Sequence, residues 1–408
     1  MSKKFFHKRK AAIKKINIFS LERQHIVYYC ILNFFKMLGL APLKVNFSKI
    51  FKNIKNNNVY LYEISKCVFL YNSFLVFAFC VYITLVFIYD LWFDDYNNSI
   101  ASFFFDRSAT LFGVIGSIFI WLYYIVHKSA IIDIVNELYS IDNYLKSTGN
   151  FYFLAKNHYL YSVFIGNFIM NGCIIFVQII FYPPISMLAW AVPCAISSWV
   201  LIQYSLVIYI IFQRCKCVNK TILRISDIST QFETIALSIT KIPICKSVIV
   251  DITNIQYINI KVCKLCGKVV DFYAFPVLIA VVYFMTVAVV NLYYTMVSLN
   301  LINYREVSLL PYIDCGLTSV LTIFNFVILT TNVTKITREI NNTAAYIHLL
   351  LDRCTMSLEV KKSLLEFSAN LLYRNIEFGS YGIIVLDGFL LQSIFGTIVT
   401  YLIILIQF

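Results

Sequence analysis

The amino-acid sequence predicts an all-α polytopic membrane protein with seven transmembrane helices, a cytoplasmic N-terminus and an extracellular C-terminus. Three observations lead to this fold class. The 408-residue chain is 60% hydrophobic and only 13% charged, whereas a soluble domain has roughly 25% charged residues. Seven segments are long and apolar enough to cross a bilayer. The positive charges are divided very unequally between alternate loops, as expected for a chain that crosses a membrane repeatedly.

Each predicted span is a run with few or no charges, close to the roughly 20 residues that a helix needs to cross a bilayer. In chain order the predicted spans are Cys67–Tyr89, Ser108–Val126, Tyr159–Tyr182, Pro184–Gln213, Phe272–Tyr304, Val307–Thr334 and Gly388–Phe408. A shorter apolar run, His25–Phe35, has about 11 residues and is followed by Lys36. Because this run is too short to cross, we expect an interfacial or re-entrant helix before the first span.

The distribution of lysine and arginine predicts how the spans are oriented. Of the 34 Lys and Arg residues, 32 lie before span one or in the segments after spans two, four and six; the other loops hold only Arg107 and Arg305. Positively charged segments stay in the cytoplasm, so the N-terminus is predicted inside and the C-terminus outside. The outer loop after span one contains the sequon Asn97-Asn98-Ser99, which predicts glycosylation of Asn97.

Several classes of protein are excluded by these features. A G-protein-coupled receptor has its N-terminus outside, and the chain lacks the Asp-Arg-Tyr and Asn-Pro-x-x-Tyr motifs of that class. The net charge of +13 is explained by orientation, since no basic stripe lies on a soluble domain that could bind nucleic acid. The close cysteine pairs Cys215–Cys217 and Cys263–Cys266 lack the second ligand pair of a zinc site, and the five histidines form no paired metal motif. We therefore expect no metal, no cofactor and no enzymatic activity.

The predicted cytoplasmic segments have apolar residues at helical spacing. Ile222–Val270 contains Ile and Val at such intervals, and Leu349–Asn375 is predicted to be one amphipathic helix. We expect spans four to seven to continue into the cytosol as helices whose apolar faces pack together or against neighbouring subunits. The alternative is that these helices are ordinary connectors within a monomer.

The C-terminus carries the most specific motif. It reads Thr400-Tyr401, five hydrophobic residues, then Gln407-Phe408, and it resembles the signature of the insect gustatory receptor family in its last span. Residues upstream that also look like that family are Gly382, Leu386, Asp387, Leu390 and Leu391. Elsewhere the resemblance is one of topology.

The resemblance implies a ligand-gated, non-selective channel for monovalent and divalent cations in the plasma membrane. Four identical or related subunits would surround one pore, and a small-molecule tastant would enter a pocket in the outer half of each helix bundle. On this basis the chain divides into four parts. These are a cytoplasmic N-terminus (1–66), six spans forming the ligand-binding bundle (67–334, with the cytoplasmic segment 214–271), cytoplasmic anchor helices (335–387) and a pore-lining span (388–408).

The last span has a polar stripe that fits this interpretation. The predicted pore-lining residues are Gln392, Gly396, Thr400, Ile404, Gln407 and Phe408. Gln392, Gly396, Thr400 and Gln407 share one helical face, and a lipid-facing helix has no use for such a face. Helix–helix packing is the alternative explanation. We expect an apolar ring at Ile404 to gate by dewetting and a ring of Gln407 amides to bind cations weakly.

Candidate ligand-binding residues are polar and aromatic side chains in the outer halves of spans three to six. They are Asn171, Gln178, Trp190, Asn291, Tyr293, Tyr294 and Asp314. Intramembrane polar groups are functional candidates, and aromatic walls suit a small organic ligand. The aromatic residues have the alternative of an interfacial belt, and the amides have that of helix–helix hydrogen bonds. Asp314 can instead lie at the headgroup boundary or pair with Arg107 or Arg305.

The ligand and the mechanism leave alternatives open. Sugar-sensing members of the family carry an acidic residue directly after the Thr-Tyr pair, where this chain has Leu402, so a bitter or orphan receptor is favoured over a sugar receptor. An insect odorant receptor-type channel shares the architecture. A secondary transporter would show an internal repeat and broken helices at matching positions, whereas the chain shows Pro193 and Pro276 but no repeat.

Overall fold

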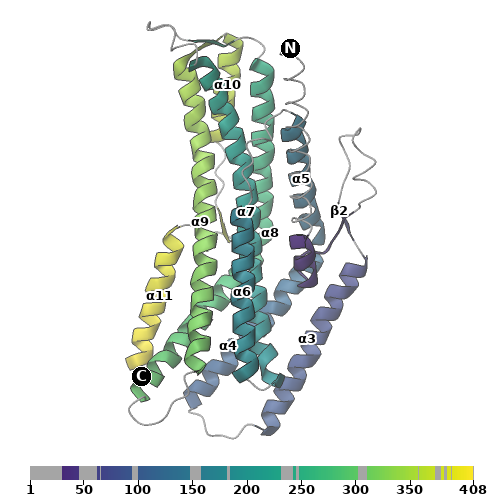
Figure 1. Cartoon of the computed structure of the whole chain (residues 1–408), viewed down its shortest axis with the longest axis vertical. Helices are drawn as coiled ribbons and strands as arrows, with labels where there is room; N and C mark the ends of the chain where they lie inside the picture. The colour runs from purple at the N-terminus through teal and green to yellow at the C-terminus, as the bar shows by residue number, and fades with distance from the viewer. Residues whose placement is uncertain are drawn as a thin grey trace, which may run out of the picture. The chain divides into compact units, whose positions relative to one another are not determined.

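The computed structural model describes residues 30–45, 62–64, 66–93, 100–147, 158–181, 184–230, 242–244, 248–301, 310–356, 358–372, 378–380, 384–386 and 388–407. After a short helix over residues 30–37, the elements are β1 Leu43–Val45, β2 Tyr62–Ile64, α3 Lys66–Phe93, α4 Ile100–Val126, α5 Lys128–Ser147, α6 His158–Phe181, α7 Pro184–Thr230, β3 Ile242–Ile244, α8 Val248–Leu301, α9 Leu310–Arg353, β4 Cys354–Met356, α10 Leu358–Leu372, β5 Gly379–Ser380, β6 Ile384–Val385 and α11 Gly388–Gln407 (Figure 1). The all-α prediction is confirmed, since the strands have two or three residues each and form three separate two-stranded pairs. β1–β2 and β5–β6 are antiparallel and β3–β4 is parallel.

The predicted spans correspond to helices in the structure. Six segments of the described chain are long and apolar enough to cross a membrane: Cys67–Val86, Arg107–Val126, His158–Ile180, Met187–Arg224, Ile252–Thr295 and Tyr312–Asp352. They overlap the first six predicted spans in order. The seventh predicted span is α11, whose 20 residues begin at the predicted Gly388. The cytoplasmic side of the N-terminus and the extracellular side of the C-terminus stay predictions.

The predicted helical continuation is confirmed for spans four, five and six, whereas its cytosolic location stays a prediction. α7, α8 and α9 run for 47, 54 and 44 residues, well beyond the predicted spans. The predicted extension of span seven is wrong for the described residues before α11, which form the β5–β6 pair.

The prediction of one helix over Leu349–Asn375 is also wrong. α9 ends at Arg353, β4 follows and pairs with β3, and α10 then begins a new helix. Strand pairing between Cys354–Met356 and Ile242–Ile244 takes the backbone hydrogen bonds that a continuous helix would need. Of the predicted pre-helix, residues 30–35 lie in the helix over 30–37, and residues 25–29 are outside the described chain.

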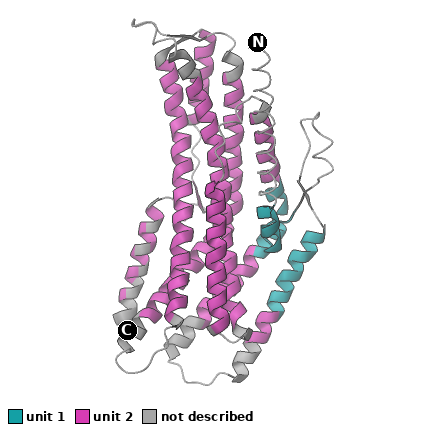
Figure 2. Ribbon diagram, viewed as in Figure 1, with its two compact units in different colours: residues 1–81, 121–132 teal, residues 82–120, 133–408 magenta. Residues whose placement is uncertain are grey.

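The chain divides into two compact units, residues 1–81 with 121–132 and residues 82–120 with 133–408 (Figure 2). In the larger unit, α7 packs against α6, α8 and α9, and 78% of an 18-residue apolar stretch within Met187–Arg224 is buried. By contrast only 28% of the corresponding 18-residue stretch within His158–Ile180 of α6 is buried. α7 is therefore the central helix of this unit, and the large exposed apolar side chains of α6 are suited to lipid.

Helix α4 approaches α7 and α8 through a row of small residues. Ala109, Gly113 and Ser117 follow one another at four-residue intervals and are all buried. A Cβ atom added to Gly113 would lie 2.6 Å from a ring carbon of Tyr283 and 3.0 Å from Pro193. The absence of a side chain at Gly113 therefore makes room for the Tyr283 ring and for Pro193, as small residues commonly do between membrane helices.

The smaller unit is organised around the end of the helix over residues 30–37. The backbone N–H of Leu40 donates to Phe35 O and that of Gly39 to Lys36 O, which is the hydrogen-bond pattern of a Schellman motif. Gly39 has φ of +78°, the left-handed conformation that this motif places at its glycine.

Three carbonyl groups at this helix end accept hydrogen bonds from side chains of α3 and α4. The Tyr71 hydroxyl donates to Met37 O at 2.7 Å, Asn72 Nδ2 to Gly39 O at 2.9 Å, and Trp121 Nε1 to Leu38 O at 2.9 Å. A helix end buried without such donors would leave polar groups unsatisfied. These bonds fix the short helix against α3 and α4 within this unit.

We predict that Gly39→Ala lowers the free energy of unfolding by about 1–2 kcal/mol, because an L-residue is strained at this φ. The added Cβ would also lie 3.0 Å from Trp121 Nε1. Gly267→Ala is the matched control, since a Cβ at this position in α8 meets nothing within 4 Å and alanine favours helix. Thermal unfolding of the purified chain in detergent measures both. Equal melting temperatures for Gly39→Ala and wild type would contradict this account.

Candidate functional site

A group of polar side chains from three helices surrounds Asp314. Asp314 lies near the start of α9 and is 9% exposed. Gln178 Nε2 on α6 lies 3.5 Å from Asp314 Oδ1, a long contact. One turn further along α9, the Thr318 hydroxyl donates to the Asp314 carbonyl at 2.8 Å and accepts from Asn291 Nδ2 on α8 at 2.7 Å. The structure thus brings together three of the predicted ligand residues, namely Gln178, Asn291 and Asp314.

Two further buried side chains lie close enough to feel the charge of Asp314. They are Cys194 on α7 and Tyr283 on α8. The Tyr283 ring fills the space beside Gly113. The sequence interpretation missed Cys194, Tyr283 and Thr318. The four-residue step from Asp314 to Thr318 was the one signal available, since it places both on one face of a helix.

Asn171 belongs to a different polar cluster. Its Nδ2 donates to Ser198 Oγ on α7 at 3.2 Å and to the Asn167 carbonyl at 2.9 Å. Ser198 Oγ donates to Asn167 Oδ1 and accepts from Asn325 Nδ2 on α9 at 3.0 Å. Asn171 therefore has the helix–helix hydrogen-bonding role that was the alternative to ligand binding.

The remaining predicted ligand residues have no contact with Asp314 among those that the structure describes. Tyr293 and Tyr294 are half-buried and pack edge to face on each other with ring centroids 5.7 Å apart. Trp190 is also half-buried and precedes Cys194 by one turn of α7. The four-residue step places Trp190 and Cys194 on the same face of the helix. Asn97 and Phe408 lie outside the described residues.

A ladder of polar contacts joins α7 to α9 along its length. Asn325 Nδ2 bonds Ser198, and Asn332 Nδ2 bonds Ser205 Oγ at 2.7 Å; both pairs are 127 residues apart in sequence. A constant offset means that the two helices run parallel and in register. Further along, Asn219 Nδ2 donates to the Glu339 carbonyl at 2.8 Å and to the Glu339 carboxylate at 3.1 Å.

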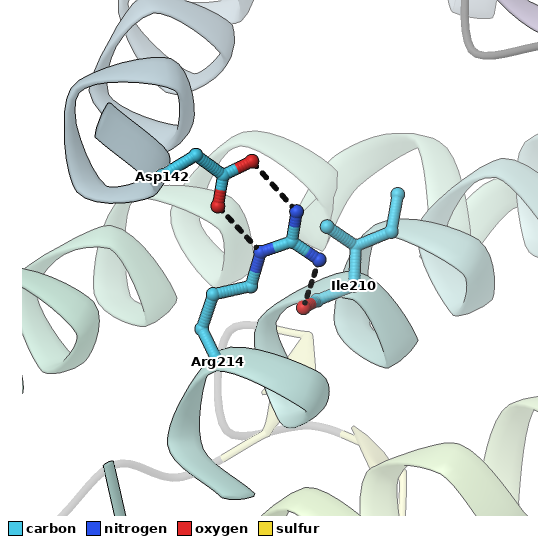
Figure 3. A network of polar contacts seen from close by, with 3 residues as sticks. All are labelled: Asp142, Ile210 and Arg214. Carbon is cyan, nitrogen blue, oxygen red and sulfur yellow. Dashed lines mark hydrogen bonds and ion pairs between the residues drawn. The ribbon is translucent and has the colours of Figure 1, made fainter. Parts of the chain in front are cut away.

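Charged side chains link α5 to the same bundle. Arg214 on α7 makes a two-point contact with Asp142 on α5, at 3.0 Å from Nε and 2.8 Å from Nη2, and its Nη1 donates to the Ile210 carbonyl (Figure 3). The side chains of Arg214 and Asp142 are 5% and 19% exposed. Lys268 on α8 pairs with Glu137 on α5, but this lysine is 40% exposed. In the predicted topology both pairs lie on the cytoplasmic side.

Helix α11 has one buried and one exposed face. It packs against α8 and α9 (Figure 1), and its buried side chains include Leu390 and Ile394. The exposed side chains are Phe389, Gln392, Ser393, Gly396, Val399, Thr400 and Ile403. Gln392, Gly396 and Thr400 are thus together on the side turned away from the rest of the chain, as predicted for a stripe that faces water or another subunit.

The lower part of the predicted stripe is described only by its backbone. Residues Tyr401, Ile404 and Gln407 lie in the helix, but their side chains are outside the described set. Ile403 is 52% exposed. At 3.6 residues per turn, Ile403 lies closer to the middle of the exposed face than Ile404 does, so Ile403 is a second candidate for the apolar ring.

Comparison with known proteins places the chain among receptors. A family model described as 7tm chemosensory receptor matches residues 28–408. The structure resembles that of the insect olfactory receptor OR5 from Machilis hrabei, with a TM-score of 0.61, 12% identity, and coverage of 94% of this chain and 98% of that chain. The structure of the same receptor in complex with eugenol gives a TM-score of 0.62 at 13% identity with the same coverage. No curated protein sequence matches significantly.

We predict that Arg214→Met lowers the free energy of unfolding by about 3 kcal/mol, because it leaves the Asp142 carboxylate without its partner. Lys268→Met is the matched control and should cost about 1 kcal/mol or less, since an exposed ion pair is weak. Thermal unfolding in detergent measures both, and adding Asp142→Asn to Arg214→Met should recover part of the loss. If Arg214→Met and Lys268→Met melt at the same temperature, the buried Arg214–Asp142 pair does not stabilise the packing of α5 more than the exposed pair does.

Proposed function

Since this chain belongs to the 7tm chemosensory receptor family, we propose that it is a gustatory receptor that acts as a ligand-gated, non-selective cation channel opened by a small-molecule tastant. The gustatory assignment is supported by Thr400-Tyr401 and Gln407-Phe408 at the end of the chain. Leu402 after the Thr-Tyr pair favours a bitter or orphan receptor over a sugar receptor.

The observation that carries the channel proposal is the exposed polar face of α11. Gln392, Ser393, Gly396 and Thr400 are exposed on a helix that is mostly apolar. A polar row on a membrane helix costs free energy against lipid, so it favours contact with water or with a neighbouring copy. If four copies are arranged around one axis with α11 innermost, the exposed face of each α11 lines a water-filled pore. The opposite face of each α11 then packs against α8 and α9 of the same subunit. The subunits are identical or closely related, and the assembly lies in the plasma membrane.

The proposed pore has no charged side chain in α11, whose sequence from Gly388 to Gln407 contains no Lys, Arg, Asp or Glu. This helix therefore cannot form a ring of charged side chains that selects among ions. Neutral amide and hydroxyl dipoles discriminate poorly among cations. We propose that Gln392 and Thr400 line the permeation path together with Gly396, with Gln407 and Phe408 at its outer end. The apolar constriction is at Ile403 or Ile404.

An odorant receptor-type channel is the second candidate function. It is favoured by the likeness to an olfactory receptor, whose structure has also been solved with eugenol. Responses to a panel of non-volatile bitter compounds and volatile odorants, recorded from cells that express the full chain, distinguish the two. A secondary transporter would instead show substrate-coupled flux without ligand-evoked currents that reverse near zero.

We predict that Thr400→Cys makes ligand-evoked current sensitive to a cationic methanethiosulfonate reagent added from the bath. Thr400 is on the exposed face of α11, so its thiol would face the permeation path and a bulky cation attached there would block it. Ile394→Cys is the control, because this position is buried on the opposite face. The wild type sets the baseline, since Cys30, Cys67 and Cys173 are already exposed. Block of Ile394→Cys but not of Thr400→Cys would overturn the pore face; ligand-evoked flux without current would overturn the channel itself.

A further inference from the structure

The Asp314 carboxylate is buried beside the amide of Gln178. It is 9% exposed, and among the described residues no lysine, arginine or histidine forms an ion pair with it. Arg107, one of the two partners considered from the sequence, is not paired with it. Its side-chain partner among the described residues is the amide of Gln178 at 3.5 Å. A carboxylate buried in a bundle of membrane helices with so little compensation is costly, and such groups are as a rule paired with a counter-charge.

The neighbouring amide presents a second unsatisfied acceptor. Gln178 is 3% exposed, and its Oε1 atom is buried without a hydrogen-bond partner. The amide orientation is determined by its neighbour, since turning it over would place Oε1 against the carboxylate oxygen. Because Gln178 Nε2 donates to Asp314, the amide oxygen Oε1 is an additional acceptor beside the carboxylate. The cluster therefore has an excess of acceptors and lacks donors.

The other polar groups nearby do not supply the missing donor. The Thr318 hydroxyl donates a hydrogen bond to the Asp314 backbone carbonyl and accepts one from Asn291 Nδ2. These bonds hold α8 and α9 together beside Asp314 and leave its carboxylate oxygens unused. The ring of Tyr283 packs against Gly113, and its hydroxyl group is within electrostatic range of the same carboxylate. An aromatic ring beside an acidic group is a favourable environment for an organic cation.

We infer that the Asp314 cluster binds the protonated amine of the ligand, with the ammonium group donating to the Asp314 carboxylate and to Gln178 Oε1. An ammonium has three donors and no acceptor, which is the complement of the excess found here. This inference rests on the proposed function, since it names the ligand class of the same receptor. The apolar remainder of the ligand would lie against Tyr283 and toward Trp190.

The test uses pairs of probes that differ only in charge. The pairs are 2-phenylethylamine with 2-phenylethanol, benzylamine with benzyl alcohol, and tryptamine with tryptophol. Binding is measured as the thermal stabilisation of the purified full chain in detergent at pH 7, and gating as current in cells that express it. The variants are Asp314→Asn, which removes the charge and keeps an oxygen for Gln178, and Asp314→Glu, which keeps the charge. Asp352→Asn is the matched control, an exposed aspartate at the other end of α9.

The expected result is that at least one amine stabilises the wild type at a concentration about tenfold or more below its alcohol, as for a hydrogen bond to a charged group. Asp314→Asn should remove this difference, while Asp314→Glu and Asp352→Asn keep it. The inference is overturned if no amine stabilises the wild type, if the alcohols act as well as the amines, or if Asp314→Asn keeps the preference.

Two further arms separate other causes. Replacing sodium by N-methyl-D-glucamine tests for an inorganic cation; an Asp314-dependent stabilisation by sodium, with no effect of the amines, would assign the site to that ion and overturn the inference. Currents separate the inference from the proposed function. Amine binding that depends on Asp314 but evokes no current would contradict the channel and leave the site intact. Currents evoked only by the alcohols would contradict the amine site and leave the channel proposal intact.

Discussion

The register between the parallel helices α7 and α9 is the constraint on which the rest of the larger unit depends. Lipid is as apolar as leucine, so apolar side chains alone give two membrane helices little reason to prefer one sliding position. Ser198–Asn325 and Ser205–Asn332 repeat after seven residues on both helices. Sliding either helix by one turn would break both of these Ser–Asn contacts and leave buried polar atoms unsatisfied. The repeat of seven also corresponds to the seam of a left-handed coiled coil, in which polar pairs set register.

The same stripe of α9 reaches both ends of the bundle. Thr318, Asn325, Asn332 and Glu339 follow one another at seven-residue intervals, and each bonds another helix: α8 at Thr318, and α7 at the other three. α6 joins the ladder where Tyr159 donates to Asn332 Oδ1 at 3.0 Å. Since Thr318 is one turn from Asp314, the ladder also fixes where the Asp314 carboxylate lies relative to α6 and α8. The candidate ligand site is thus an extension of the structural seam rather than a separate feature.

Most of the helices could be predicted from the sequence, because hydropathy and charge alone decide which segments can cross a membrane. Gly388 as the first residue of α11 and the common face of Gln392, Gly396 and Thr400 follow from 3.6-residue periodicity. The break after Arg353 could not be predicted, since β4 exists only through its pairing with Ile242–Ile244, more than a hundred residues away in sequence. Nor could the polar residues be sorted into roles. Asn171 and Gln178 are both amides two turns apart on α6, and only the tertiary partners show that Ser198 satisfies the former whereas the latter keeps an unpaired oxygen.

Helices α8 and α9 connect the proposed ligand site with the proposed pore. Asn291 and Thr318 join these two helices beside Asp314, and both helices pack against α11. An ammonium group drawn toward Asp314 acts on the contact between α6 and α9, where the Gln178 bond is long and weak. A ligand can shift an equilibrium only through contacts that differ between two states, and the Asp314–Gln178 contact, tightened or bridged by a cation, is such a contact. The helices that hold it are the ones that support α11.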